Sequence, residues 1–209
     1  MSVGFVKNDP RLAFDDASHT YTLGERRLVS VTQVLGLTGL ADFSQPWFSD
    51  VVKDRGTALH RAIALDIEER LDEESIDDPQ VLGGLTGWRA FLAAAGAEVE
   101  QCERQLCDPE MGVAGRLDCI VVMADAAGRR WRYIVDIKRS LYPCAAIQLA
   151  GYLDMAAALY DGPVHLRRAA LVLPGDGTYT FHPFTDHTDR ATWQAAVRVV
   201  NWRRANGLA

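Results

Sequence analysis

The chain has 209 residues, of which 48% are hydrophobic, so it is long enough to bury a sizeable core. Its formal net charge of −6 argues against a protein that coats nucleic acid by bulk electrostatics, although bound divalent cations would offset acidic charge where a phosphate approaches. The apolar runs are too short for a membrane span and the N-terminus lacks the apolar stretch of a signal peptide, which predicts a cytoplasmic protein with no membrane partner.

The N-terminal part, residues 1–43, is expected to form a hairpin and a short helix. Residues 19–30 favour two strands around the turn Gly24-Glu25. Thr32 is placed to cap a helix that ends at Leu37. We therefore expect an opening hairpin ahead of the main body of a single domain.

Residues 44–97 are expected to be helical. The spacing of apolar residues predicts a helix over 45–71, broken or bent near Gly56. A second helix is predicted over 79–95, because Asp78-Pro79 combines an N-cap with proline at the first helical position.

Residues 98–209 change to the alternating pattern of strands before they return to helix. We expect three antiparallel strands at 98–107, 115–123 and 131–139, a helix at 143–160, a hairpin of strands at 168–173 and 178–184, and a closing helix at 188–204. This order predicts an α/β (α+β) fold in which a central mixed sheet of about five strands is flanked by helices.

Two aspartates occupy mirror positions in the second and third of these strands. The midpoint between Asp118 and Asp136 is position 127, which lies in the turn 126–128, so a regular hairpin sets the two residues opposite each other. Alternation along the strand then places Lys138 on the same face as Asp136. Two facing carboxylates among apolar neighbours repel each other unless a cation neutralises them. The pattern thus favours a Mg²⁺ or Mn²⁺ site, and the alternative is a solvated or ion-paired strand face.

Five short motifs follow one another along the chain, after a hairpin motif, Phe14-Asp-x-x-x-His19-x-Tyr21, that leads into Ser30-Val-Thr32. They are Arg55-Gly-Thr-Ala-Leu-His60, Glu103, Gly112-Val-Ala-Gly115-Arg-Leu-Asp118, Val135-Asp136-Ile-Lys138 and Gln148-x-x-x-Tyr152. In this order they resemble the PD-(D/E)XK nucleases, within them the RecB-like and phage λ-exonuclease-like branch. The resemblance implies a restriction-endonuclease-like core. Two departures are the aspartate at 136, where glutamate is more usual, and the leucine before Asp118, where the family has proline.

The resemblance also implies roles for individual residues. His60, Asp118, Asp136 and the backbone carbonyl of Ile137 would bind the metal ion. Lys138 would act on the attacking water, and Gln148 and Tyr152 would point at the active site or the DNA backbone. Three roles stay open for Glu103. It could support the ligands from behind, bind a second ion, or form a surface salt bridge.

Structural alternatives stand beside these roles. His60 can equally be a hydrogen-bonded, partly buried histidine, and Gln148 with Tyr152 can be the face of a helix packed on the sheet. Arg55, Arg116 and Arg139 lie close in sequence to the proposed site elements and could contact phosphates.

The resulting hypothesis is a Mg²⁺- or Mn²⁺-dependent deoxyribonuclease, an exonuclease that acts on DNA ends in recombination or repair, of phage or prophage origin. The alternatives are a nucleic-acid-binding or scaffold module without hydrolytic activity and a structure-specific endonuclease. Homo-oligomer formation has precedent in the family. Because the sequence shows no helicase motif or phosphate-binding glycine loop, any unwinding would need a helicase or recombination partner protein.

Overall fold

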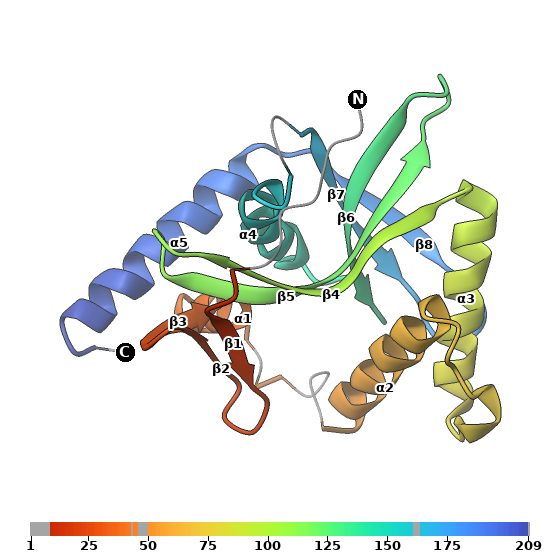
Figure 1. The fold of residues 1–209 in the computed structure, drawn as a ribbon, viewed down its shortest axis with the longest axis horizontal. Coiled ribbons are helices and arrows are strands. Elements are labelled where there is room, and N and C mark those ends of the chain that lie inside the picture. Colours follow the sequence, from red (N-terminus) through yellow and green to blue (C-terminus); the bar gives the residue numbers. More distant parts are fainter. Residues whose placement is uncertain (1–8, 43, 46–49, 161–163, 209) are drawn as a thin grey trace.

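The computed structural model describes residues 9–42, 44–45, 50–160 and 164–208. In these residues an eight-stranded mixed sheet is flanked by five α-helices (Figure 1). The strands are β1 (Leu12–Asp15), β2 (Thr20–Leu23), β3 (Arg26–Ser30), β4 (Glu98–Asp108), β5 (Val113–Ala124), β6 (Arg130–Lys138), β7 (Leu166–Val172) and β8 (Thr180–Phe184). The helices are α1 (Val31–Leu37), α2 (Asp50–Ile67), α3 (Pro79–Ala95), α4 (Ala145–Ala157) and α5 (Thr188–Ala205), with a short 3-10 turn, η2 (Glu73–Ser75), before α3.

The strand order is β1-β2-β3-β5-β6-β7-β8, and β4 pairs with β5 outside this path. The pairs β3–β5 and β6–β7 are parallel, and the others are antiparallel. The predicted class, a central mixed sheet flanked by helices, is confirmed. The expected number of about five strands is wrong, because β1, β2 and β3 continue the sheet beyond β5.

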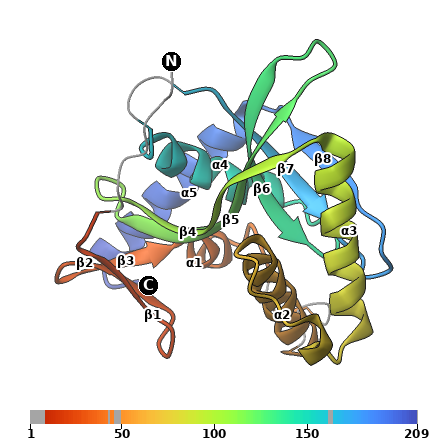
Figure 2. The ribbon, with the colours of Figure 1, turned by 45° about the vertical axis from the view of Figure 1, so that its right-hand side comes forward.

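Helices cover both faces of the sheet. Ile120 and Val121 are neighbours on β5, yet they belong to different apolar clusters because successive side chains of a strand point to opposite faces. Ile120 packs in the cluster that α4 and α5 complete, whereas Val121 packs in the cluster of α2 and α3. Figure 2 shows α2 and α3 side by side, apart from α4 and α5. None of the described helices is both long and apolar enough to cross a membrane.

The N-terminal hairpin forms as predicted. The hairpin motif Phe14-Asp-x-x-x-His19-x-Tyr21 also forms a strand pair, in which β1 pairs with β2 at Phe14 and Tyr21. One detail differs from the prediction. Helix α1 is capped by Ser30, not by Thr32: the Ser30 hydroxyl accepts the Gln33 amide N–H at 3.0 Å, and the Gln33 side chain accepts the Ser30 N–H at 3.0 Å. This reciprocal capping box satisfies two backbone donors, which Thr32 inside the helix cannot do.

Helix α2 runs through Gly56 without the predicted break. Its first described residue is Asp50, and residues 46–49 of the expected helix lie outside the described part. Asp78 connects α2 to α3, because its Oδ2 accepts Arg55 Nε at 2.6 Å while its Oδ1 accepts the Gln80 N–H at 2.8 Å as the N-cap of α3. One carboxylate therefore both begins α3 and holds α2 against it.

Candidate active site

Three carboxylates form one row across neighbouring strands. The β5–β6 ladder runs from Ala124↔Arg130 to Cys119↔Val135, so the same register sets Asp118 opposite Asp136, as predicted. On the other side of β5, the pairs that flank Glu103 place it opposite Asp118. β4, β5 and β6 each contribute one acidic residue at the same level of the sheet.

His60 reaches this row from α2. Its Nδ1 lies 3.3 Å from Glu103 Oε1 and 3.5 Å from Asp118 Oδ1, and its Nε2 lies 3.2 Å from the carbonyl oxygen of Ile137. Burial lowers the pKa of His60, but the Asp118 and Glu103 carboxylates outweigh it and raise that pKa to about 9. Without a metal ion, the imidazole is therefore a cation at neutral pH that donates from both nitrogens.

Asp136 and Lys138 form a pair beside this group. Lys138 Nζ lies 3.0 Å from Asp136 Oδ1, and Gln148 Nε2 donates to the same oxygen at 3.3 Å. Asp136 is only 2% exposed, and its burial raises its pKa. Burial lowers the pKa of Lys138, but the Asp136 and Asp118 carboxylates raise it further, so Lys138 stays an ammonium group.

The group of ligand atoms differs from the predicted set. Within the described residues, the side chains whose ligand atoms all lie within 4.8 Å of one another are His60, Glu103 and Asp118. Asp136 is not among them, and its Oδ1 pairs with Lys138 instead. Glu103 has a left-handed backbone (φ 48°), which is rare and costly for a residue with a Cβ, and its side chain joins the group from there.

This group suits a hard divalent cation. Its carboxylate oxygens are the donors that Mg²⁺ and Mn²⁺ prefer in proteins, and its imidazole nitrogen is a donor that divalent transition metals accept. Asp136 Oδ2 is buried and lacks a hydrogen-bond partner in the described part of the chain. A buried anionic oxygen without a partner is costly unless a cation lies next to it. Asp118 is already fixed, because its Oδ2 accepts the backbone N–H of Ile137 at 2.6 Å.

Gln148 and Tyr152 both lie on the face of α4 that meets the sheet, but their surroundings differ. Gln148 contacts the Asp136 carboxylate, as described above. Tyr152 is only 5% exposed and packs in the apolar core, where a Cβ on Gly115 would lie 2.8 Å from its ring. Burial raises the pKa of Tyr152 well above its ordinary value, and the nearby Asp118 and Asp136 carboxylates act in the same direction. The phenol therefore stays protonated.

Of the three arginines predicted to contact phosphate, only Arg116 has its ion-pair partner in the acidic group, with Nη1 3.8 Å from Glu103 Oε2. Arg55 binds Asp78 at the start of α3. Arg139 donates to the Gln80 side chain at 2.7 Å and to the carbonyl oxygen of Pro174 at 2.9 Å. The contacts of Arg55 and Arg139 therefore join segments of the fold to one another.

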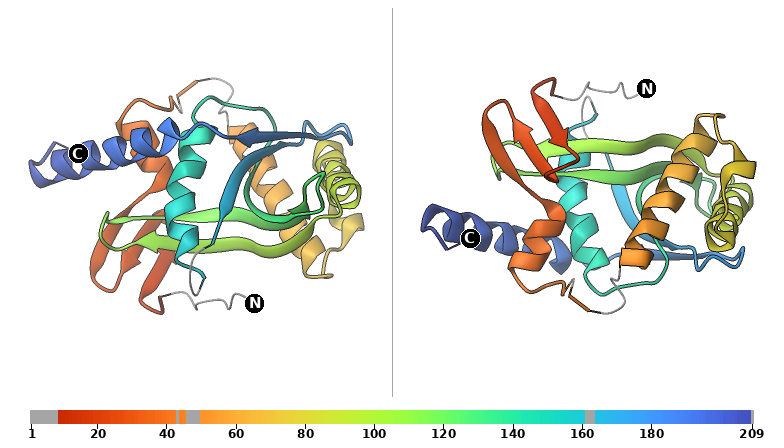
Figure 3. Two further views of the ribbon diagram at one scale, coloured as in Figure 1. Left: turned by 90° about the horizontal axis from the view of Figure 1, so that it is seen from above. Right: turned by 90° about the horizontal axis from the view of Figure 1, so that it is seen from below.

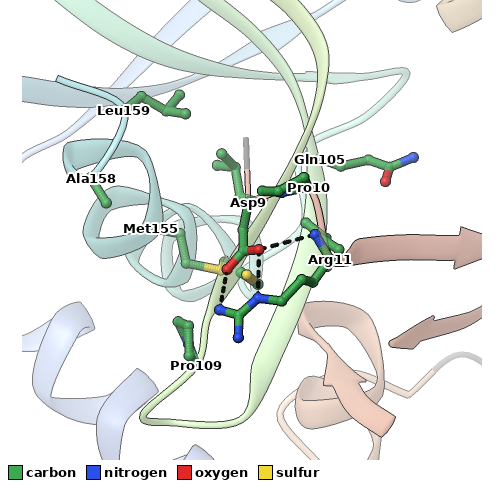
Figure 4. Close-up of a pocket in the computed structure, with 11 residues that line it drawn as sticks. Asp9, Pro10, Arg11, Gln105, Pro109, Met155, Ala158 and Leu159 are labelled. Carbon is green, nitrogen blue, oxygen red and sulfur yellow. Dashed lines mark hydrogen bonds and ion pairs between the residues drawn. The ribbon is translucent and has the colours of Figure 1, made fainter. Parts of the chain in front are cut away.

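Two hollows flank this end of the sheet. One, of about 560 Å³, is bounded by the N-terminal hairpin, β5 and α4, and Arg116 and Gln148 line it. Figure 3 shows from two sides that the hairpin lies beside β5 and α4, at the opposite end of the molecule from α3. The other, of about 630 Å³, lies between β4 and the end of α4 (Figure 4). Its charged lining residues, Asp9 and Arg11, bind each other at 2.7 Å, so this second hollow presents no unpaired charge.

Comparisons with known proteins give a distant likeness. No family model matches the chain, and no curated protein matches it either. Among solved structures, it is similar to SSO0001, with a TM-score of 0.31 and 17% identity over 71% of this chain and 68% of the other. It is also similar to LHK-Exo, solved in complex with dAMP, with a TM-score of 0.35 and 16% identity over 87% of this chain and 95% of the other.

Proposed function

We propose that this chain is a divalent-metal-dependent phosphodiesterase that hydrolyses DNA, with Mg²⁺ or Mn²⁺ as its cofactor. The observation that carries the proposal is the convergence of His60, Glu103 and Asp118 next to the Asp136–Lys138 pair. A purely structural role does not account for this group, because it concentrates three acidic side chains and leaves one buried oxygen without a partner among the described residues.

The residues of the site have two proposed roles, metal binding and orientation of the attacking water. His60, Glu103 and Asp118 would hold the metal ion, together with Asp136 Oδ2 and the Ile137 carbonyl oxygen. A divalent ion supplies a Lewis acid for the phosphate oxygen and lowers the pKa of a bound water. Lys138 stays protonated, so it orients the attacking water and balances negative charge rather than removing a proton.

Gln148 lies between the proposed metal site and the space proposed for the substrate. Its amide donates to Asp136 and also lines the hollow beside the N-terminal hairpin. It thus holds the Asp136 carboxylate from α4 while facing the space where a DNA strand would pass. Tyr152, one helical turn further along α4, packs against β5 and supports the same wall.

The finer assignment rests on the sequence resemblance to the PD-(D/E)XK nucleases. By that resemblance we propose an exonuclease acting on DNA ends in recombination or repair, from a phage or prophage. A homo-oligomer and a helicase or recombination partner protein belong to the same proposal, as do a cytoplasmic location and the organisation of residues 1–209 as a single nuclease domain.

The test is hydrolysis of linear and circular DNA in the presence of Mn²⁺. We expect the wild type to degrade linear DNA and Asp118→Asn and Lys138→Ala to lose this activity. Asp154→Asn, which removes an acid that pairs with Arg190 on the surface, is the matched control and should stay active. Cleavage of closed circles would favour the endonuclease, and DNA binding without turnover in the wild type would favour the scaffold module. Activity that survives in both site variants would refute the proposal.

A further inference from the structure

The N-terminal hairpin has a place beside the candidate site that the proposed chemistry does not use. The guanidinium carbon of Arg116 lies 5.1 Å from the ring centroid of Phe14, over the face of that ring. The ion pair from Arg116 to Glu103 is long, at 3.8 Å, and the Arg116 side chain makes no hydrogen bond within the described ranges. Phe14 is therefore a main contact of this guanidinium.

Phe14 itself is held firmly. Its ring centroid lies 4.4 Å from that of Tyr21, its partner across the β1–β2 pair, and Tyr21 is buried in a small cluster with Leu28 and Ala114. The hairpin is also joined to β5, because β3 pairs with it in parallel at Val113 and Ala114. The ring therefore has a fixed position relative to the strand that carries Arg116.

Each of the two contacts is weak on its own, which is why the ring matters. A long, partly exposed ion pair contributes little because water and salt screen it, whereas a cation–π contact strengthens as water is excluded. The Arg116 side chain is 35% exposed, so neither contact alone fixes it. Together they hold the guanidinium at the wall of the 560 Å³ hollow, where its N–H donors can meet an anion.

We propose that Phe14 is a positioning residue that holds the guanidinium of Arg116 for a phosphate of the bound DNA strand. The inference rests on the proposed nuclease function for the identity of the ligand. It also gives the Phe14-x₄-His19-x-Tyr21 motif a physical role, because the hairpin presents an aromatic face to an arginine on a strand about a hundred residues later in the chain.

The test is the affinity for a fluorescent DNA duplex, measured by anisotropy over a series of salt concentrations with Ca²⁺ in place of a catalytic metal. Phe14→Leu keeps apolar volume but removes the ring, and it should weaken binding about twofold to fivefold. It should also lower the slope of log affinity against log salt by about one, the effect of one lost phosphate contact. Phe14→Tyr keeps the aromatic face and should bind as the wild type does.

A double-mutant cycle distinguishes positioning from a general structural role. In an Arg116→Ala background, Phe14→Leu should cause no further loss, because the side chain it positions is gone. Trp202→Leu removes an aromatic ring that is 61% exposed on α5, and this control should leave affinity and slope unchanged.

Equal losses in both backgrounds, a Phe14→Tyr variant as weak as Phe14→Leu, or no DNA binding by the wild type would overturn the proposal. DNA binding that follows the expected pattern without hydrolysis would instead refute the nuclease function and leave the positioning role in place.

Discussion

The tight packing next to the candidate site predicts a large effect from one added methyl group. In Gly115→Ala, the new Cβ would lie 2.8 Å from Tyr152 Cε1, 2.9 Å from the Tyr152 hydroxyl and 3.0 Å from Val31 Cγ2. Ordinary carbon contacts are about 3.5–4.0 Å, so the neighbours must move by roughly 0.5–1 Å. Both are buried, and overpacking of this kind costs about 1–3 kcal/mol.

For a chain of this length, 1 kcal/mol corresponds to about 2–4 °C in melting temperature. Gly115→Ala should therefore lower the melting temperature by roughly 2–12 °C in a thermal unfolding experiment. Because Tyr152 follows Gln148 on α4, the displaced ring should also reduce the proposed nuclease activity.

Gly56→Ala is the matched control for this substitution. Nothing lies within 4 Å of its added Cβ, and it should stabilise the mid-helix position by up to about 1 kcal/mol. A Gly115→Ala variant that melts with the wild type, or that rises as Gly56→Ala does, would refute the packing argument.

Three further predictions concern the acidic row and the core. Mn²⁺ at a hundred times its dissociation constant should stabilise the protein by about 2.7 kcal/mol in a thermal shift assay; Asp118→Asn should abolish this gain, and a gain that persists would contradict the ligand assignment. Glu103→Gly should be more stable than Glu103→Ala by about 1 kcal/mol in urea unfolding, since only glycine adopts the left-handed backbone without strain; the reverse order would count against that conformation. Arg168→Met should destabilise by about 3 kcal/mol in the same assay, because it leaves the Asp189 carboxylate without its 3.0 Å partner in a largely buried position; a loss below about 1 kcal/mol would show that the pair is weakly coupled.

The parts of the site that depend on strand register could be predicted from the sequence. The turn between β5 and β6 fixes which residues face each other, and alternation then places Lys138 with Asp136. The helix limits around Asp78-Pro79 followed from local capping signals in the same way. These features depend on residues close together in the chain.

The remaining parts depend on contacts that no local pattern contains. Glu103 joins the ligand atoms from a left-handed backbone conformation that glutamate rarely adopts, so the sequence does not predict its place there. Arg55 and Arg139 were assigned to phosphate from their nearness in sequence. Their partners instead come from the start of α3, which meets α2 at Arg55 and the end of β6 at Arg139.

Asp78 both caps α3 and binds Arg55 of α2, so the position of the His60 imidazole depends on the junction between these two helices. The helix that carries His60 is fastened through Arg55 to the same carboxylate that caps α3. Loss of that carboxylate would fray the beginning of one helix and release the other, so a change that resembles a surface substitution would displace a proposed metal ligand. Screens for inactivating variants should therefore find hits at this helix junction as well as along the acidic row.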